Sequence, residues 1–150
     1  MSRKTLTLIV ALVIAPVIVY FVWPSDEARI RKLIREGARA VEEEKIEEVM
    51  APVSFNYADD RGATYLLIKE AMTRFFRNMD NIKVEYEIAR IAITKQTAEA
   101  ELDLRVVASS GADTGYIMGD ISRPLHMKFV LEKERASWLI VKATGLPRYY

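Results

Sequence analysis

The chain has 150 residues, of which 51% are hydrophobic and 29% charged, a composition typical of a folded protein and not of a disordered one. Setting Arg3 and Lys4 aside leaves 20 basic residues against 21 acidic ones, so the rest of the chain lacks the basic excess that nucleic-acid binding needs. With no cysteine and one histidine, it also lacks the ligand clusters of a zinc site. We therefore expect no nucleic acid, metal or cofactor as a partner.

An uncharged run from Thr5 to Trp23 follows Arg3 and Lys4 and precedes a strongly charged stretch. As a helix the run would be about 28 Å long, close to the ~30 Å hydrocarbon thickness of a bilayer. Bulky residues continue up to Trp23, so the small-residue cleavage site of a secretory signal is missing. The sequence predicts a transmembrane anchor over residues 1–24, in the membrane through residues 5–23, and one domain over residues 25–150.

Basic residues flank both ends of this run, at Arg3 and Lys4 before it and between residues 29 and 35 after it. Counting them weakly favours a cytoplasmic domain. The first pair directly abuts the run, however, whereas the second group begins inside an expected folded helix. We favour an external or periplasmic domain over a cytoplasmic one.

Three helices are expected after the anchor. Ser25 and Asp26 begin the first, in which apolar residues recur at helical spacing from Ile30 to Val41. A charged break over residues 42–45 leads to a short helix over 46–50, which Pro52 ends. Residues 53–57 alternate as a short strand. Thr64 then caps a third helix that reaches Met79 and presents one apolar face.

From Ile82 onward the apolar period is two, which predicts antiparallel strands over 82–94, 97–108, 116–132 and 137–144. The apolar positions of the first strand change parity near Ala89 and Arg90, so a β-bulge is expected there. The acidic side chains of the long strands have outward parity. We expect the third helix to cover the inner face, with Phe75 or Phe76 buried against Leu102, Leu104 and Phe129.

Helices followed by a sheet indicate an α+β fold. The sequence resembles the nuclear transport factor 2-like superfamily in segment 53–59 with Gly62 and in segments 131–134 and 138–141. This cystatin-like, cone-shaped fold is shared with ketosteroid isomerases and polyketide cyclases. The resemblance implies three helices packed on a curved antiparallel sheet, with a pocket between them, and does not by itself imply an activity.

Candidate site residues are few. No residue qualifies as catalytic, since the acids point outward and His126 has the parity of a surface residue. Asp59 and Asp60 have the chemistry of a turn. Aromatic residues that could line the pocket and hydrogen-bond a ligand are Tyr57, Tyr65, Tyr86, Tyr116 and Phe129. Core packing is the alternative role for each of them.

The sequence favours a membrane-anchored, non-enzymatic module that binds a small apolar ligand or a protein partner. One alternative is an enzyme of the isomerase, dehydratase or cyclase type, and another is a purely structural assembly domain. The charged outer face of the sheet disfavours pairing of two sheets, because desolvating many charges is costly. We therefore expect residues 25–150 to be monomeric.

Overall fold

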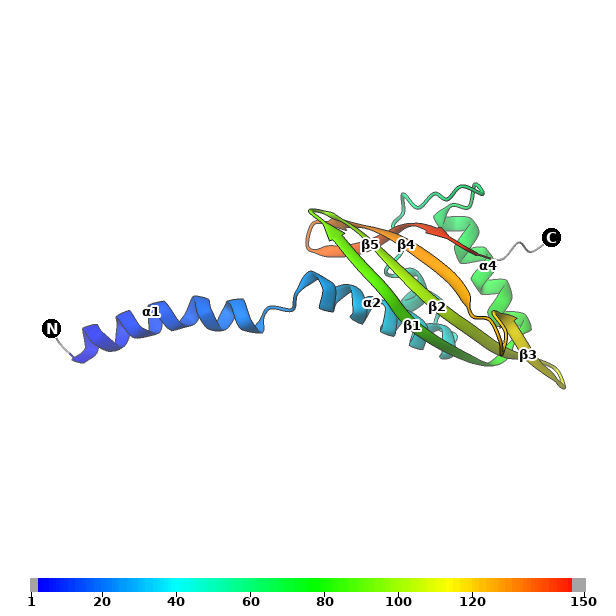
Figure 1. Ribbon diagram of the computed structural model, residues 1–150, viewed down its shortest axis with the longest axis horizontal. Helices are drawn as coiled ribbons and strands as arrows, with labels where there is room; N and C mark the ends of the chain where they lie inside the picture. The colour runs from blue at the N-terminus through cyan, green and yellow to red at the C-terminus, as the bar shows by residue number, and fades with distance from the viewer. Residues whose placement is uncertain (1–2, 147–150) are drawn as a thin grey trace.

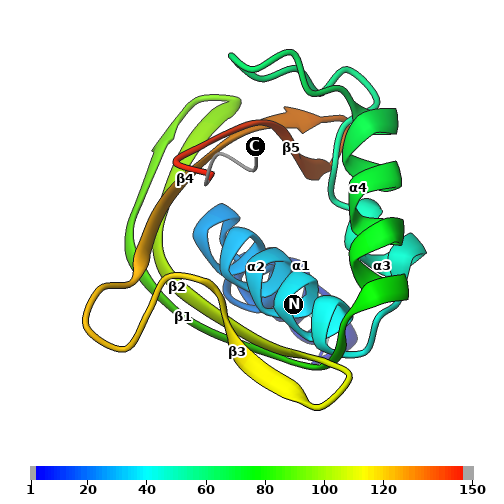
Figure 2. The same ribbon diagram turned by 90° about the vertical axis from the view of Figure 1, so that its right-hand side faces the viewer.

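A computed structural model of the chain describes residues 3–146. The helices are α1 (Arg3–Val22), α2 (Asp26–Glu42), α3 (Ile46–Met50) and α4 (Tyr65–Asn78). The strands are β1 (Asp80–Thr94), β2 (Thr97–Ser110), β3 (Asp113–Met118), β4 (Leu125–Glu134) and β5 (Ser137–Thr144). The three helices after α1 pack on a curved antiparallel sheet (Figures 1 and 2), which confirms the predicted α+β class.

The sheet has the order β1-β2-β4-β5, and β3 pairs with the far end of β2. The single strand predicted over 116–132 is therefore wrong, because residues 119–124 form a loop between β3 and β4. Gly119 turns the chain at a φ of +66°, and a Cβ there would lie 2.9 Å from the carbonyl oxygen of Leu104. Asp120 closes the loop by accepting hydrogen bonds from the backbone amides of Ser122 and Arg123, both at 2.8 Å. β4 thus pairs with residues 97–104 of β2 and with β5, whereas β3 pairs with residues 106–110 of β2.

The bulge predicted in the first strand is confirmed. The pairing of β1 with β2 shifts register between Ile88 and Arg90. Ile88 lies opposite Leu102, and after the shift Ile91 lies opposite Ala100, so both isoleucines face the inner side of the sheet. The extra residue keeps the apolar side chains on one face and bends the strand.

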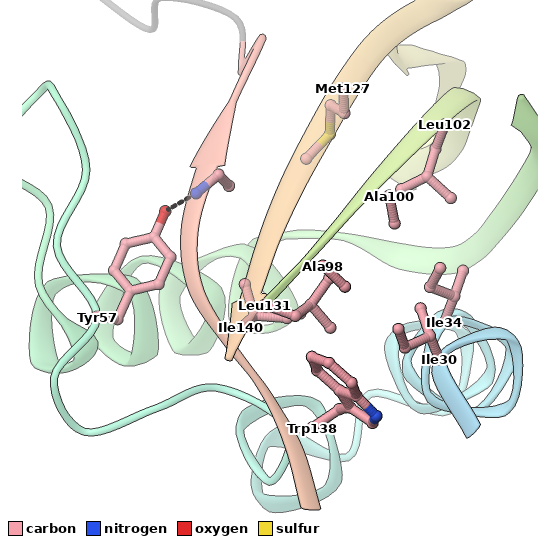
Figure 3. Close-up of a cluster of buried hydrophobic side chains, with 11 residues drawn as sticks. Ile30, Ile34, Tyr57, Ala98, Ala100, Leu102, Met127, Leu131, Trp138 and Ile140 are labelled. Carbon is pink, nitrogen blue, oxygen red and sulfur yellow. Dashed lines mark hydrogen bonds between the residues drawn. The ribbon is translucent and has the colours of Figure 1, made fainter. Parts of the chain in front are cut away.

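Helix α2 fills the hollow of the sheet (Figures 2 and 3). Its N-terminus is capped by Ser25, whose Oγ accepts a hydrogen bond from the amide of Ala28 at 3.1 Å. Ile30 and Ile34 are buried in the same cluster as Ala98 and Ala100 of β2, whose small side chains let the helix approach. Burying each large aliphatic side chain contributes about 1.5–3 kcal/mol.

Helix α4 does not cover the inner face as predicted. None of its residues is fully buried, and it lies on the far side of α2 from the middle of the sheet (Figure 2). Phe75 and Phe76 are half-buried and pack against a second cluster formed by Ile82, Val106 and Ala108. Of their predicted partners, Leu104 packs on this same cluster, whereas Leu102 and Phe129 belong to the main one. The expectation failed because α2 already occupies the hollow, which leaves α4 the edge of the domain.

The predicted short strand over residues 53–57 is also wrong. Val53 forms a single parallel bridge with Ile140 of β5, and the amide of Ser54 donates to the Ile140 carbonyl at 2.9 Å. A turn follows at once, closed by the hydrogen bond from the amide of Tyr57 to the carbonyl of Ser54 at 3.0 Å. The alternation therefore stops, so Ser54 and Tyr57 are buried while Phe55 is 84% exposed.

Helix α1 extends away from the domain (Figure 1). Among the helices of the described residues, none is both long enough and apolar enough to cross a membrane.

Candidate ligand-binding site

Two of the aromatic residues predicted to line a pocket, Tyr86 and Phe129, lie on the inner face of the sheet with two leucines beside them. Tyr86 of β1 pairs with Leu104 of β2, and Leu104 pairs with Leu125 of β4, so these three form one row across the sheet. Phe129 lies further along β4, opposite Ala100 on one side and Ala143 on the other. All four are half-buried and pack against the main core cluster. We call Tyr86, Leu104, Leu125 and Phe129 the inner-face residues.

Part of their surface stays accessible because of what surrounds them. Phe129 stands between two alanines in its row, and neither is large enough to cover an aromatic ring. Tyr65 and Ile68 of α4 pack against the same core cluster and are also half-buried. Half-buried apolar side chains of the sheet and of a helix thus pack against the same core cluster.

The tyrosine hydroxyls differ in what they bind. Among the described residues, those of Tyr65, Tyr86 and Tyr116 form no hydrogen bond. Tyr86 therefore brings an unused donor to the inner face, where a carbonyl or phenol oxygen could accept it. The ring of Tyr65 also packs against that of Phe55 in a tilted arrangement, with the ring centroids 4.7 Å apart.

Tyr57 has a structural role instead. It is 3% exposed, and its hydroxyl accepts a hydrogen bond from the amide of Ala143 at 3.1 Å (Figure 3). The same hydroxyl donates to Asp59 at 3.2 Å. Burial and the nearby negative charge of Asp59 raise the pKa of Tyr57 to about 12. Its donor and acceptor are both used and its side chain packs in the core, so its predicted part in ligand binding stays a prediction.

Tyr116 lies apart from the inner-face residues. It is 43% exposed on β3, opposite Val107 at the far end of β2. Of the five aromatic residues proposed from the sequence, Tyr65, Tyr86 and Phe129 thus share the core side of the domain, whereas Tyr57 is fully used and Tyr116 is remote.

Carboxylates occupy the outer face of the sheet. These acidic side chains are half-buried or exposed. The strand register places each of them opposite another polar side chain on a neighbouring strand: Glu85 opposite Arg105, Glu87 opposite Asp103, and Glu101 opposite both Arg90 and Lys128. The predicted outward parity is confirmed. No carboxylate that could act as a general base lies in the row of Tyr86, Leu104 and Leu125 or in the row of Phe129.

His126 is 58% exposed in its side chain and lies on the outer face, as predicted. Its Nδ1 is 2.8 Å from a carboxylate oxygen of Asp103, with which it pairs across β2 and β4. Sequence reasoning missed this pair because only the strand register brings the two residues together. Within the described residues, no group of three histidine, cysteine or acidic side chains could hold a metal ion.

An exposed apolar surface on the helical side was also missed. Phe55 and Leu66 are 84% and 73% exposed, and Leu66 borders an open hollow of about 380 Å³ on α4. Lys69, Arg74 and Arg77 line that hollow together with Glu70 and Thr73. Lys69 pairs with Glu47 at 2.8 Å, and Arg74 pairs with Glu70 at 3.9 Å. The alternation over residues 53–57 predicted only a short strand and gave no indication of this surface.

Comparison with solved structures supports the fold. A cystatin-like domain of unknown function from Nostoc punctiforme has 20% identity and a TM-score of 0.63, with 82% of this chain and 78% of that chain covered. A ketosteroid isomerase-like protein from Erwinia carotovora has 14% identity and a TM-score of 0.63, with 81% and 95% covered.

A longer protein from Bdellovibrio bacteriovorus has 15% identity and a TM-score of 0.64, and the match covers 83% of this chain but 42% of that one. No family model matches the sequence, and no curated protein matches it. At these identities the comparisons establish the cystatin-like, nuclear transport factor 2-like fold and leave the activity open.

Proposed function

We propose that this protein is a membrane-anchored, non-enzymatic module that binds a small apolar ligand against the inner face of its sheet. The observation that carries this proposal is the chemistry of the inner-face residues. They are apolar and half-buried, they include one unused tyrosine hydroxyl, and the acids of the same strands lie on the opposite face. Such a surface can bind and orient a ligand, but it offers no group that transfers a proton at neutral pH.

The ligand class follows from these groups. Leu104, Leu125 and Phe129 offer aliphatic and aromatic contacts, and Tyr86 offers a single donor. A compact apolar molecule with one carbonyl or phenol oxygen satisfies both requirements. A charged ligand would lose its hydration without gaining an opposite charge on this face.

The anchor is supported by the uninterrupted uncharged sequence from Thr5 to Trp23. Along α1, large apolar side chains are exposed in every direction: Leu8, Ile9, Leu12, Val13, Val17 and Ile18 are between 44% and 73% exposed. Exposed apolar surface of this extent is unfavourable in water and favourable in hydrocarbon. We place the domain on the external side of the membrane, as the charge pattern around the run favours.

A protein partner is the second candidate occupant, and it is favoured by a different surface. Phe55 and Leu66 expose large apolar side chains, and Leu66 borders the hollow of α4 that basic residues and Glu70 line. An enzyme of the isomerase, dehydratase or cyclase type is less well supported. It would need a general base on the inner face, and the described strands keep their acids outside.

The test is a titration of residues 25–150 with prodan, an apolar naphthalene ketone whose fluorescence reports its surroundings. We expect saturable binding that Leu104→Trp abolishes by filling the face. Tyr86→Phe should weaken binding about 2- to 10-fold, the worth of one neutral hydrogen bond.

Tyr116→Phe is the matched control, because it removes the same hydroxyl from a remote strand. Circular dichroism should show all three variants folded. Equal affinity for the Leu104→Trp variant and the unmodified domain would exclude the inner face as the binding site.

A further inference from the structure

Two hairpin turns lie together at the end of the sheet that faces α1 (Figure 1). Lys95 and Gln96 connect β1 to β2, and Arg135 and Ala136 connect β4 to β5. The carbonyl oxygen of Gln96 accepts a hydrogen bond from the amide of Lys133 at 2.8 Å, which holds the two turns side by side. We call Lys95, Arg135 and the nearby Arg29 the basic tip.

Arg29 joins this end of the sheet to α1. Its guanidinium donates a hydrogen bond to the carbonyl oxygen of Ala136 at 3.2 Å. It also lies 5.6 Å from the ring centroid of Trp23, just beyond the last residue of α1. The tip therefore lies next to the point where the predicted membrane segment ends.

The charge of the basic tip is only partly compensated within the domain, where Arg29 acts electrostatically on the carboxylate of Asp26. Arg29, Lys95 and Arg135 form no ion pair among the described residues, whereas the neighbouring acids are engaged. Asp26 binds Lys133 at 2.9 Å, and Glu27 binds Arg31 at 2.8 Å. Among the described residues, Lys95 and Arg135 thus remain without an ion pair at one end of the molecule, beside the half-buried and partly engaged Arg29.

The backbone of both turns is left-handed at the basic residue. Lys95 and Arg135 have φ angles of 56° and 58°, in the region that glycine or asparagine adopts more readily.

We propose that the basic tip contacts the anionic headgroups of a lipid bilayer, so that the domain rests on the membrane surface through its two hairpin turns. This inference depends on the proposed membrane anchor. Only residues 23–25 separate α1 from α2, and an extended residue spans at most ~3.6 Å. The tip must therefore stay near a surface whose potential reaches about 8–10 Å at physiological salt.

The experiment uses the full chain, which has no cysteine, so single labelling sites can be introduced cleanly. Gln96→Cys places a fluorescent label on the tip, and Ala112→Cys places it on the opposite hairpin between β2 and β3. Each labelled protein is reconstituted into phosphatidylcholine vesicles, with or without phosphatidylglycerol, that contain a headgroup-attached quencher.

We expect quenching at position 96 to exceed that at position 112, to rise with phosphatidylglycerol and to fall at high salt. Lys95→Glu with Arg135→Glu should remove the phosphatidylglycerol-dependent part. Lys83→Glu with Arg90→Glu is the matched control, because it makes the same change of charge on the exposed side of β1 and should leave quenching intact.

The outcomes separate the two proposals. Release of the protein from vesicles by an alkaline wash would overturn the anchor. Stable insertion with equal quenching at positions 96 and 112, or with quenching that is indifferent to phosphatidylglycerol, would overturn the basic tip and leave the anchor standing. The salt and lipid dependence of the unmodified tip keeps the test decisive even if a charge-reversed variant folds poorly.

Discussion

The indole nitrogen of Trp138 donates a hydrogen bond to the carboxylate of Asp26 at 3.0 Å, which joins the first turn of α2 to β5. Lys133 of β4 donates to the same carboxylate at 2.9 Å. Asp26 thus receives two side-chain donors at a helix N-terminus, where the helix dipole also favours a negative charge. The contact fixes α2 in the hollow of the sheet.

Asp26→Ala should lower the free energy of unfolding by about 1–2 kcal/mol. Hydrogen bonds to a charged group are worth roughly 1.5–3 kcal/mol, and we reduce this because the Asp26 side chain is 34% exposed. Glu36→Ala is the control, since its pair with Lys32 at 3.6 Å lies on the open side of the same helix and should contribute less than about 0.5 kcal/mol. Urea unfolding measures both, and equal losses would contradict the role of Asp26.

Stability should also fall in acid through this residue. Hydrogen bonds from Lys133 and Trp138 lower the pKa of Asp26 below its ordinary value of 3.8. The folded protein then binds this proton less readily than the unfolded chain, so the stabilisation is complete above pH 3.8 and is lost as the pH falls through the lower folded pKa. Asp26→Asn should flatten this part of the profile of unfolding free energy against pH. An unchanged acid limb would show that other carboxylates control it.

Tyr57→Phe should cost about 1–3 kcal/mol, because the buried amide of Ala143 loses its hydrogen-bond acceptor. The pKa of Tyr57 is raised to about 12 from an ordinary value of 10.0, so its contribution is complete below pH 10.0 and is lost as the pH rises toward 12. The variant should lack this alkaline loss. Tyr116→Phe, at an exposed position, should change the free energy of unfolding by less than about 0.5 kcal/mol. Similar effects for the two variants would place Tyr57 outside the core.

Membrane attachment should reside in the N-terminal segment. Residues 25–150 expressed alone should remain in the supernatant as a folded domain, because the exposed apolar side chains of α1 are then missing. The full chain should sediment with membranes and resist a high-salt wash. Sedimentation of the shortened chain with membranes after that wash would reveal a second attachment.

The domain should be monomeric at micromolar concentration. Its outer sheet face carries charges that are paired within one molecule, such as Lys128 with Glu99 at 3.4 Å and His126 with Asp103 at 2.8 Å. Burying such a face costs several kcal/mol per ion, as a rough figure, unless new partners are found. Light scattering of residues 25–150 provides the measurement. A salt-resistant dimer that Glu101→Ala or Arg105→Ala disrupts would show that the charges pair across an interface.

Local sequence patterns predicted much of the fold. Ser25 and the spacing of Ile30 and Ile34 indicated α2, because helix capping and a period near four depend only on nearby residues. The parity change near Ala89 and Arg90 likewise predicted the bulge in β1. The outward acids and His126 followed from strand alternation, which holds wherever one face of a sheet is buried.

Contacts between distant segments were decided only in the folded chain. Both α2 and α4 present apolar faces, and only packing shows that α2 occupies the hollow and leaves Phe75 and Phe76 half-buried at the edge. His126 lies beside Asp103 because of the register of β4 against β2. The two turns of the basic tip lie together because the carbonyl of Gln96 bonds the amide of Lys133. Periodicity along the chain determines which side of an element is apolar. Which other element covers that side depends on shape and volume across the whole domain, and these exist only once it has folded.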